Sequence, residues 1–366
     1  MKNDNRNDRR TSGPAKGTGK TKVTGKANAV GKTKVTAGKE NRVPVGQGRE
    51  KTAVKNKSGI CPVADKCGGC SWINQPYAEQ LKKKEKQLGE LLAPFCKIEG
   101  VIPMEHPEHY RNKVHAVFGE NRYHDAISGI YEQKSHRIVP VNSCLIENAK
   151  ADEIIVSIRG LLKSFHIRPY NEDTGYGLLR HALIRTGHVT GQIMVVLVLA
   201  SPILPSKNNF VKALLKLHPE ITTVVINVNN RNTSMVLGDK EHVIYGKGYI
   251  EDELCGKRFR ISPKSFYQVN PVQTEILYGK ALEYAGLTGK ETVVDAYCGT
   301  GTIGMIASDK AGKVISVELN ADAVRDARNN AKANQIRNIQ FYQNDAGKFL
   351  VEMACLLYTS PSPRDT

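Results

Sequence analysis

From about residue 266 onward, apolar strand-like runs alternate with amphipathic helix-like segments, and this alternation restricts the possible folds more than any other feature of the chain. The spacing of apolar residues predicts, in order, helix 270–286, strand 291–299, helix 301–312, strand 313–319, helix 320–335 and strand 339–345. Strands separated by helices pair in parallel, because each helix returns the chain to the starting edge of the sheet. The sequence therefore predicts a doubly wound α/β sheet here.

Residues 110–262 follow a different pattern, dominated by short strand-like runs and turns. The predicted strands are 113–119, 127–133, 136–141, 181–187, 192–201, 222–230, 233–239 and 257–263, and two predicted helices interrupt them at 151–165 and 208–218. Strands that follow one another through short turns tend to pair antiparallel. We therefore expect a mixed α+β region with much antiparallel pairing before the α/β region.

A glycine-rich segment, VVDAYCGTGTIG at 293–304, lies where a predicted strand passes into a helix. Gly299 and Gly301 allow a sharp turn and a close approach of ligand to backbone, and the helix N-terminus favours a negative group. The next strand ends near Glu318, where a carboxylate can accept hydrogen bonds from ribose hydroxyls. The glycine spacing also fits a dinucleotide-binding fold, but Asp295 at the strand end resembles the S-adenosylmethionine loop of class I methyltransferases.

Three of the eight cysteines lie within ten positions, in CPVADKCGGC at 61–70. The chain has no apolar signal segment at its start, so we expect a reducing cytoplasm, where cysteines serve as ligands or core thiols rather than disulfides. Soft thiolate ligands suit zinc or an iron–sulfur cluster. The spacing alone favours zinc slightly and leaves both open.

The first 58 residues are strongly basic, with 16 Lys and Arg against 4 Asp and Glu, whereas the whole chain has a net charge of +17. They contain almost no large apolar side chains, so we expect a disordered tail that meets a polyanion, most often a nucleic acid. The longest apolar run, 193–200, has eight residues, and a membrane-spanning helix needs about 20. We therefore expect no membrane association.

Five motifs in this order resemble those of the RNA (uracil-5-)-methyltransferase family. They are CPVADKCGGC (61–70), HYRNKVHAVF (109–118), SCLIEN (143–148), SPKSFYQVNPVQTEILY (262–278) and DAYCGTGTIG (295–304). The resemblance covers residues 61 to about 350. It implies a central α+β RNA-binding domain followed by a Rossmann-like class I methyltransferase domain, of which this chain contains about three of the seven strands.

The resemblance also implies two cofactors. A [4Fe-4S] cluster is expected on Cys61, Cys67, Cys70 and Cys144. S-adenosylmethionine is expected to contact Gln268, Tyr297, Glu318, Asp295, Gly299, Gly301 and, with less support, Asp345. From the residues alone, the preferred interpretation is that Gln268 is a polar helix cap and Tyr297 a half-buried strand residue.

The implied reaction is methylation of C5 of a uridine. A cysteine thiolate adds to C6, C5 attacks the sulfonium methyl, a base removes the C5 proton, and the cysteine is eliminated. The family's nucleophile and base are expected after an Asp-Pro-Pro-Arg motif that this sequence lacks, so no catalytic residue is assigned, and Cys355 lacks the expected polar context. We expect residues 355–366 to be foreign to the fold.

These arguments predict five segments: a basic tail (1–58), a cysteine segment with a helix (59–96), a central domain (97–262), a partial methyltransferase domain (263–354) and an unrelated tail (355–366). The cluster cysteines favour large-subunit ribosomal RNA as substrate over transfer RNA. A catalytically inactive RNA-binding chain and a zinc-dependent RNA-binding protein remain as alternatives. No obligate protein partner is indicated.

Overall fold

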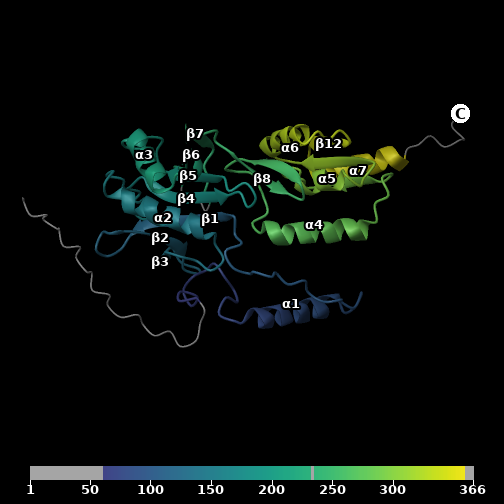
Figure 1. The fold of residues 1–366 in the computed structure, drawn as a ribbon, viewed down its shortest axis with the longest axis horizontal. Coiled ribbons are helices and arrows are strands. Elements are labelled where there is room, and N and C mark those ends of the chain that lie inside the picture. Colours follow the sequence, from purple (N-terminus) through teal and green to yellow (C-terminus); the bar gives the residue numbers. More distant parts are fainter. Residues whose placement is uncertain (1–60, 232–234, 359–366) are drawn as a thin grey trace, which may run out of the picture. The chain divides into compact units, whose positions relative to one another are not determined.

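The computed structural model describes residues 61–231 and 235–358, whose helices and strands are labelled in Figure 1. The predicted basic tail, residues 1–58, lies outside the described residues, as does most of the predicted C-terminal tail. The helices are α1 (Tyr77–Leu92), α2 (Ala149–Leu162), α3 (Lys207–Leu217), α4 (Pro271–Ala285), α5 (Thr302–Ala307), α6 (Ala321–Ala333) and α7 (Ala346–Tyr358).

The strands form three sheets. They are β1 (Lys113–Glu120), β2 (Ala126–Tyr131), β3 (Ile138–Pro140), β4 (Leu179–Thr186), β5 (Ile193–Leu199), β6 (Ile221–Val228), β7 (Lys240–Tyr245), β8 (Ile250–Leu254), β9 (Lys257–Ile261), β10 (Thr292–Asp295), β11 (Lys313–Glu318) and β12 (Ile339–Gln343). The sheet orders are β3-β2-β1-β4-β5-β6-β7, β8-β9 and β10-β11-β12.

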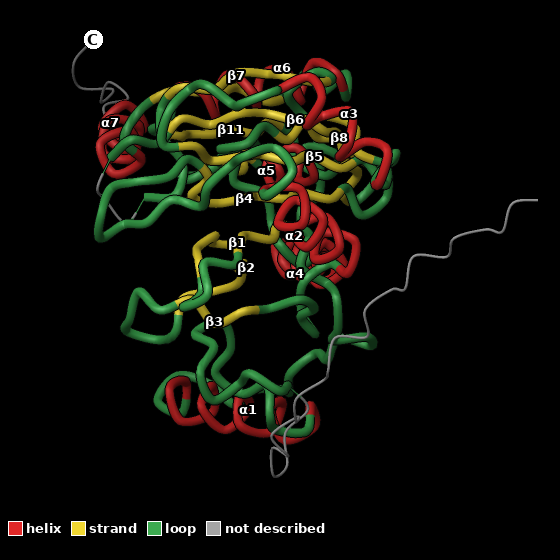
Figure 2. Tube along the Cα trace, turned by 90° about the vertical axis from the view of Figure 1, so that its left-hand side faces the viewer, coloured by secondary structure: helices red, strands yellow, loops and turns green. Residues whose placement is uncertain are grey.

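The seven-stranded central sheet is antiparallel except between β5 and β6, which α3 connects in parallel. Its neighbouring strands β3, β2, β1 and β4 follow one another in Figure 2. The apolar run at 193–200 forms β5, every residue of which is buried, as expected of an inner strand covered on both faces. One face packs against α2 and α3 through side chains such as Ile158, Phe210 and Leu214.

The prediction of a strand at 233–239 is wrong for its described part, because residues 235–239 form a loop and the next strand, β7, begins at Lys240. Two buried asparagines of and beside β6 explain this difference. Asn229 donates to the carbonyl oxygens of Met235 and Val236, and Asn227 donates to that of Gly238. These side chains satisfy backbone groups that would otherwise need a strand partner.

The other face of the central sheet shares a core with the C-terminal part of the chain. Met194 and Val196 of β5 pack in one cluster with Phe259 of β9, Tyr278 of α4 and Met305 of α5. This core crosses the boundary predicted between 262 and 263. The β8-β9 hairpin therefore connects the two regions through buried apolar side chains rather than through a linker alone.

We expect Phe259→Ala to lower the free energy of unfolding by about 3–5 kcal/mol, because it opens a cavity in this shared core. The Phe259 side chain is 0% exposed. Phe95→Ala is the matched control, since Phe95 is 83% exposed, and it should change the stability by less than about 0.5 kcal/mol. Urea unfolding of both variants measures the difference, and equal effects would contradict a shared core at Phe259.

The C-terminal sheet confirms the predicted α/β pattern, because β10, β11 and β12 pair in parallel and alternate with α5 and α6. The sequence predicts the start of α6 well. The Asn320 side chain accepts hydrogen bonds from the backbone N–H groups of Asp322 and Ala323, as an N-cap does.

No residue of α1 is buried, and Leu91 is 72% exposed. The last helix differs from the prediction. The chain was expected to lose helical pattern after residue 354, yet α7 continues through Cys355 to Tyr358. Among the described helices, none is long and apolar enough to cross a membrane.

Candidate cofactor and cysteine sites

The carboxyl ends of the three parallel strands bring the predicted cofactor residues to one edge of the sheet. Asp295 ends β10 and pairs with Ser316, and Glu318 ends β11 and pairs with Gln343 at the end of β12. Asp345 follows two residues later. Open α/β sheets bind ligands outside this edge of their strands. The parallel register therefore gathers carboxylates that lie up to 50 residues apart in the chain.

The glycine loop after β10 is held by both carboxylates. The Gly299 N–H donates to Oε2 of Glu318 at 3.0 Å, and the Gly304 N–H donates to Oδ2 of Asp295 at 3.1 Å. Gly301 has φ +83°, and a Cβ there would lie 2.6 Å from the Met305 side chain. The loop therefore requires glycine at 301 for both conformation and space.

Glu318 retains hydrogen-bonding capacity after these contacts. Its Oε1 accepts the N–H of Asn320 at 2.8 Å and its Oε2 accepts that of Gly299. A carboxylate offers about four lone-pair positions, so about two remain. A fixed carboxylate with unused acceptor positions at a strand end is suited to bind two neighbouring hydroxyl groups.

Asp295 has an unusual environment for a carboxylate. Burial, with a smaller contribution from the nearby Glu318 charge, raises the pKa of Asp295 from its ordinary 3.8 to about 6, although hydrogen bonds from backbone N–H groups oppose this rise. At a pH between these two pKa values, the Asp295 carboxyl is protonated in the folded state and ionised in the unfolded state. The contribution of Asp295 to stability therefore falls as the pH rises from about 4 to about 6.

Asp295→Asn is expected to remove this part of the pH dependence while keeping an oxygen that can accept the Gly304 N–H. Urea midpoints measured from about pH 4 to about pH 6 should then vary less for the variant than for the original chain. Asp173→Asn, at an exposed loop position, is the control and should leave the profile unchanged. An unaltered profile in Asp295→Asn contradicts the raised pKa.

The remaining predicted cofactor residues lie in different environments. Tyr297 follows β10 in a turn and is 82% exposed, so it is not a half-buried strand residue and its ring is free to stack on a ligand. Asp345 accepts the Lys348 N–H at 3.0 Å and so caps α7. Gln268 precedes α4, but the cap of that helix is Asn270, whose side chain accepts the Gln273 N–H. Gln268 is therefore not the helix cap.

The segment that carries Gln268 is fixed to the central sheet at the start of β1. The Asn112 side chain donates to the carbonyl oxygen of Gln268 at 3.0 Å, and the Asn112 N–H donates to that of Val269 at 3.0 Å. The buried Arg185 donates to the carbonyl oxygens of Pro263 and Ser265. Polar groups of the central sheet thus position the segment before α4.

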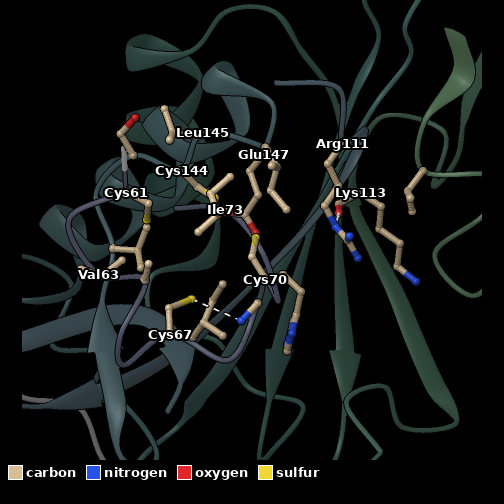
Figure 3. Close-up of a pocket in the computed structure, with 18 of the residues that line it drawn as sticks. Cys61, Val63, Cys67, Cys70, Ile73, Arg111, Lys113, Cys144, Leu145 and Glu147 are labelled. Carbon is tan, nitrogen blue, oxygen red and sulfur yellow. Dashed lines mark hydrogen bonds between the residues drawn. The ribbon is translucent and has the colours of Figure 1, made fainter. Parts of the chain in front are cut away.

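All four predicted cluster cysteines line one cavity of about 550 Å³. Figure 3 shows Cys61, Cys67, Cys70 and Cys144 gathered at one side of it. The first three come from the loop before α1, and the fourth comes from the segment between β3 and α2. The fold therefore brings together cysteines that are 74 positions apart in the chain, Cys70 and Cys144.

Local contacts set the orientation of these cysteines. The Gly69 N–H donates to Sγ of Cys67 at 3.4 Å, and a Cβ at Gly69 would also lie 3.4 Å from that sulfur. The Cys144 N–H donates to the Asp152 carboxylate at 2.7 Å. Backbone hydrogen bonds and a small residue beside a sulfur are features that favour a ligated thiolate.

Two of the four thiols, those of Cys70 and Cys144, have raised pKa values. Burial raises the pKa of Cys70, and the neighbouring Cys67 and Cys61 raise it further. Burial raises the pKa of Cys144 to about 11. In the part of the chain that the structure describes, no three His, Cys, Asp or Glu side chains are close enough to hold one metal ion. The four cysteines as placed therefore do not form a compact single-ion site.

The other cysteines have no such arrangement. Cys298 is buried beside the glycine loop, and burial raises the pKa of its thiol to about 12. A thiol with this pKa is protonated at neutral pH and is a poor nucleophile. Cys96 is exposed, and burial raises the pKa of Cys255.

Sequence reasoning missed several residues of the cysteine cavity. Arg111, Lys113 and His115 line it, as does Phe266, which is 69% exposed. The signal for the three basic residues was available, because they alternate in RNKVH and a strand places alternate side chains on one face. The position of Phe266 across the cavity depends on the anchoring of residues 263–269 and could not be read from the chain.

Comparison with known proteins places these sites in context. Residues 287–355 match a family model described as a methyltransferase domain. The chain is 41% identical over 295 residues to an uncharacterised RNA methyltransferase of Halalkalibacterium halodurans and 41% identical over 298 residues to one of Caldanaerobacter subterraneus. The chain is similar to RNA methyltransferases. These matches cover 79% and 80% of this chain but 64% and 66% of the relatives' own lengths.

The fold is also shared with a solved RNA methyltransferase. The crystal structure of Pyrococcus abyssi tRNA (uracil-54, C5)-methyltransferase in complex with S-adenosyl-L-homocysteine matches with a TM-score of 0.64 at 23% identity, over 75% of this chain and 65% of that one. This match supports the predicted Rossmann-like class I methyltransferase fold. At this identity it carries no information about the substrate.

Proposed function

We propose that this chain belongs to an S-adenosylmethionine-dependent RNA methyltransferase that methylates C5 of a uridine. The observation that carries the proposal is the Glu318–Gly299 hydrogen bond of 3.0 Å, which joins the end of β11 to the glycine loop at the ligand-binding edge of the sheet. The similarity to RNA methyltransferases over most of the chain supports the RNA substrate.

S-adenosylmethionine supplies an electrophilic methyl group on a sulfonium. In our proposal, Glu318 accepts hydrogen bonds from the two ribose hydroxyls through the lone pairs that its backbone contacts leave free. The exposed ring of Tyr297 stacks on or hydrogen-bonds to the cofactor. Gln268, held by Asn112 through its backbone, offers a donor and an acceptor to the charged methionine end.

The turn around the cofactor is maintained by Asp295, Gly299 and Gly301. Asp295 fixes the loop from inside through Gly304, and the two glycines permit its left-handed conformations, with φ +55° at 299 and +83° at 301. Asp345 follows β12 at the same edge and is proposed to flank the adenine, although its carboxylate also caps α7.

We further propose a [4Fe-4S] cluster on Cys61, Cys67, Cys70 and Cys144. Four thiols around one cavity supply a suitable set of soft ligands. A cubane binds each cysteine through a different iron atom, whereas zinc draws all four sulfurs onto one ion at about 2.3 Å. Among the described residues, no three of these side chains are close enough to hold one ion, and this separation favours the cubane.

As substrate we propose 23S ribosomal RNA, because the cysteine set resembles the cluster-containing ribosomal branch of the uracil-5 methyltransferases. Transfer RNA is the alternative, because it is the substrate of the branch of that family that generally lacks these cysteines. The excess of basic residues at 1–58 suits either polyanion.

No residue in the described part of the chain is proposed as nucleophile or general base. Cys298 is buried with a raised pKa, and four other cysteines are proposed cluster ligands. Cys355, in α7, is not proposed for this role.

Transfer of a labelled methyl group from S-adenosylmethionine to RNA tests the proposal. The full-length protein that contains this sequence should label C5 of uridine in a transcript of 23S ribosomal RNA, and less so in transfer RNA. Labelling of another base contradicts the uracil assignment, and preferential labelling of transfer RNA contradicts the ribosomal one. The second candidate function, RNA binding without turnover by this chain, predicts cofactor and RNA binding but no transfer.

A further inference from the structure

A row of basic side chains forms one wall of the cysteine cavity. Arg111 lies just before β1, and Lys113 and His115 follow at alternate positions of the strand, so that all three line the cavity. Alternate residues of a strand lie on one face about 6.8 Å apart. Figure 3 shows Arg111 and Lys113 across the cavity from Cys61 and Cys67.

Lys113 has no carboxylate within 4.0 Å in residues 61–231 and 235–358. Arg111 donates to the carbonyl oxygen of Lys113, and its charge acts on Glu147, a carboxylate that lines the same cavity. Burial, together with the positive charges of Arg185 and Arg111, lowers the pKa of Lys113 to about 8. The Nε2 atom of His115 is buried and has no hydrogen-bond partner. Partly buried cations without counter-charge are costly, and an anionic ligand relieves that cost.

Two anions could occupy the cavity, namely the proposed cluster with its thiolates and a phosphate of the RNA. We assign Arg111 to the first of these anions and Lys113 to the second. Arg111 acts on Cys70 and lowers its pKa, whereas the charges that act on Lys113 are those of Arg185 and Arg111. Lys113 lies across the cavity from Cys61 and Cys67, as Figure 3 shows. Phe266 and Val269, next to the proposed cofactor residue Gln268, line the same cavity.

We propose that Lys113, with His115 beside it, binds a backbone phosphate of the RNA next to the nucleotide that is to be methylated. This inference rests on the proposed function, and it names the group of the substrate that this wall recognises. The cavity extends from the cysteines to the segment before α4, so a phosphate on Lys113 lies between the proposed cluster and the proposed cofactor residues. Arg111, at the cysteine end of the cavity, offsets the negative charge of the proposed cluster and its thiolates.

The salt dependence of RNA binding tests this proposal. The full chain is reconstituted anaerobically with iron and sulfide, and its affinity for oligouridylate is measured over a range of salt concentrations. Lys113→Gln should reduce the slope of log K against log salt by about 0.7, the value for one phosphate contact with a single strand. Lys113→Arg should keep the slope. Lys212→Gln, which removes the same charge from an exposed position of α3, should keep it as well.

A second measurement uses the unaltered chain and does not depend on the folding of a variant. Oligouridylate in which single phosphates are replaced by neutral methylphosphonates should show one position that weakens binding to the original chain and has little further effect in Lys113→Gln. The proposal is overturned if no position behaves in this way, or if Lys113→Gln keeps the slope and instead changes the iron content or visible spectrum. Cofactor binding remains intact in these outcomes, whereas failure of the original chain to bind both oligouridylate and S-adenosylhomocysteine contradicts the proposed function itself.

Discussion

Replacement of Glu318 by alanine is expected to weaken the binding of S-adenosylhomocysteine by about 10-fold to about 100-fold. A hydrogen bond to a charged group contributes about 1.5–3 kcal/mol, and we propose that Glu318 makes such bonds to the ribose. The substitution also removes the acceptor of the Gly299 N–H, which holds the glycine loop against the end of β11. Isothermal titration of the chain with S-adenosylhomocysteine measures the loss.

Two further variants separate the ribose contact from general damage. Glu318→Gln keeps one carbonyl oxygen for the Gly299 N–H, so its loss of affinity should be smaller than that of the alanine variant. Glu85→Ala removes a carboxylate from an exposed position of α1 and should leave the affinity within about twofold. If Glu318→Ala binds as tightly as Glu85→Ala, Glu318 does not contact the ligand.

Substitution of Cys70 by serine is expected to remove most of the iron from the anaerobically reconstituted chain. The original chain should contain about four iron and four inorganic sulfide per molecule, as a cubane requires. Cys70 lines the cavity with the other three cysteines and is close enough to Cys67 and Cys61 for their charges to raise its pKa. Loss of one ligand opens the cluster to solvent, so both metal and visible absorption should fall. Iron and sulfide analysis measures the outcome.

Cys96→Ser is the matched control, because Cys96 is exposed and does not line the cavity. It should keep the full iron and sulfide content. About one zinc per chain, without sulfide or visible absorption, supports the alternative of a zinc site and contradicts the cluster. Equal iron loss in the two serine variants contradicts the assignment of Cys70.

The parts of the fold that the sequence predicts well are those determined by local patterns. The strand predicted at 313–319 is β11 in the C-terminal sheet, which runs over Lys313–Glu318. Four successive residues of this strand, Val314 to Val317, are buried because helices cover both faces of a parallel sheet. The helix predicted at 320–335 is α6, whose Asn320 cap is visible in the sequence. Such signals need only the residues within one element.

The misses share a different cause. The sequence predicts the helix α1 but not its surroundings, because burial depends on a distant partner, and no residue of α1 is buried. Residues 235–239 have strand-like composition, yet side chains from Asn227 and Asn229 hold the described segment around Met235 to Gly238 as a loop. Both outcomes depend on residues outside the element itself, which its own pattern does not reveal.

The candidate sites also combine features that the sequence determines with features that only the tertiary structure determines. The sequence by itself determined the glycine positions of the loop at 299–301, the acidic strand ends and the cysteine spacing at 61–70, because these are local requirements of turns and of metal ligands. The family resemblance, not the spacing, groups Cys144 with the other three cysteines, and only the tertiary structure decided that all four line one cavity and that Lys113 lines it too. The physical reason is that strand pairing and the shared core, rather than any local pattern, determine which distant side chains lie together.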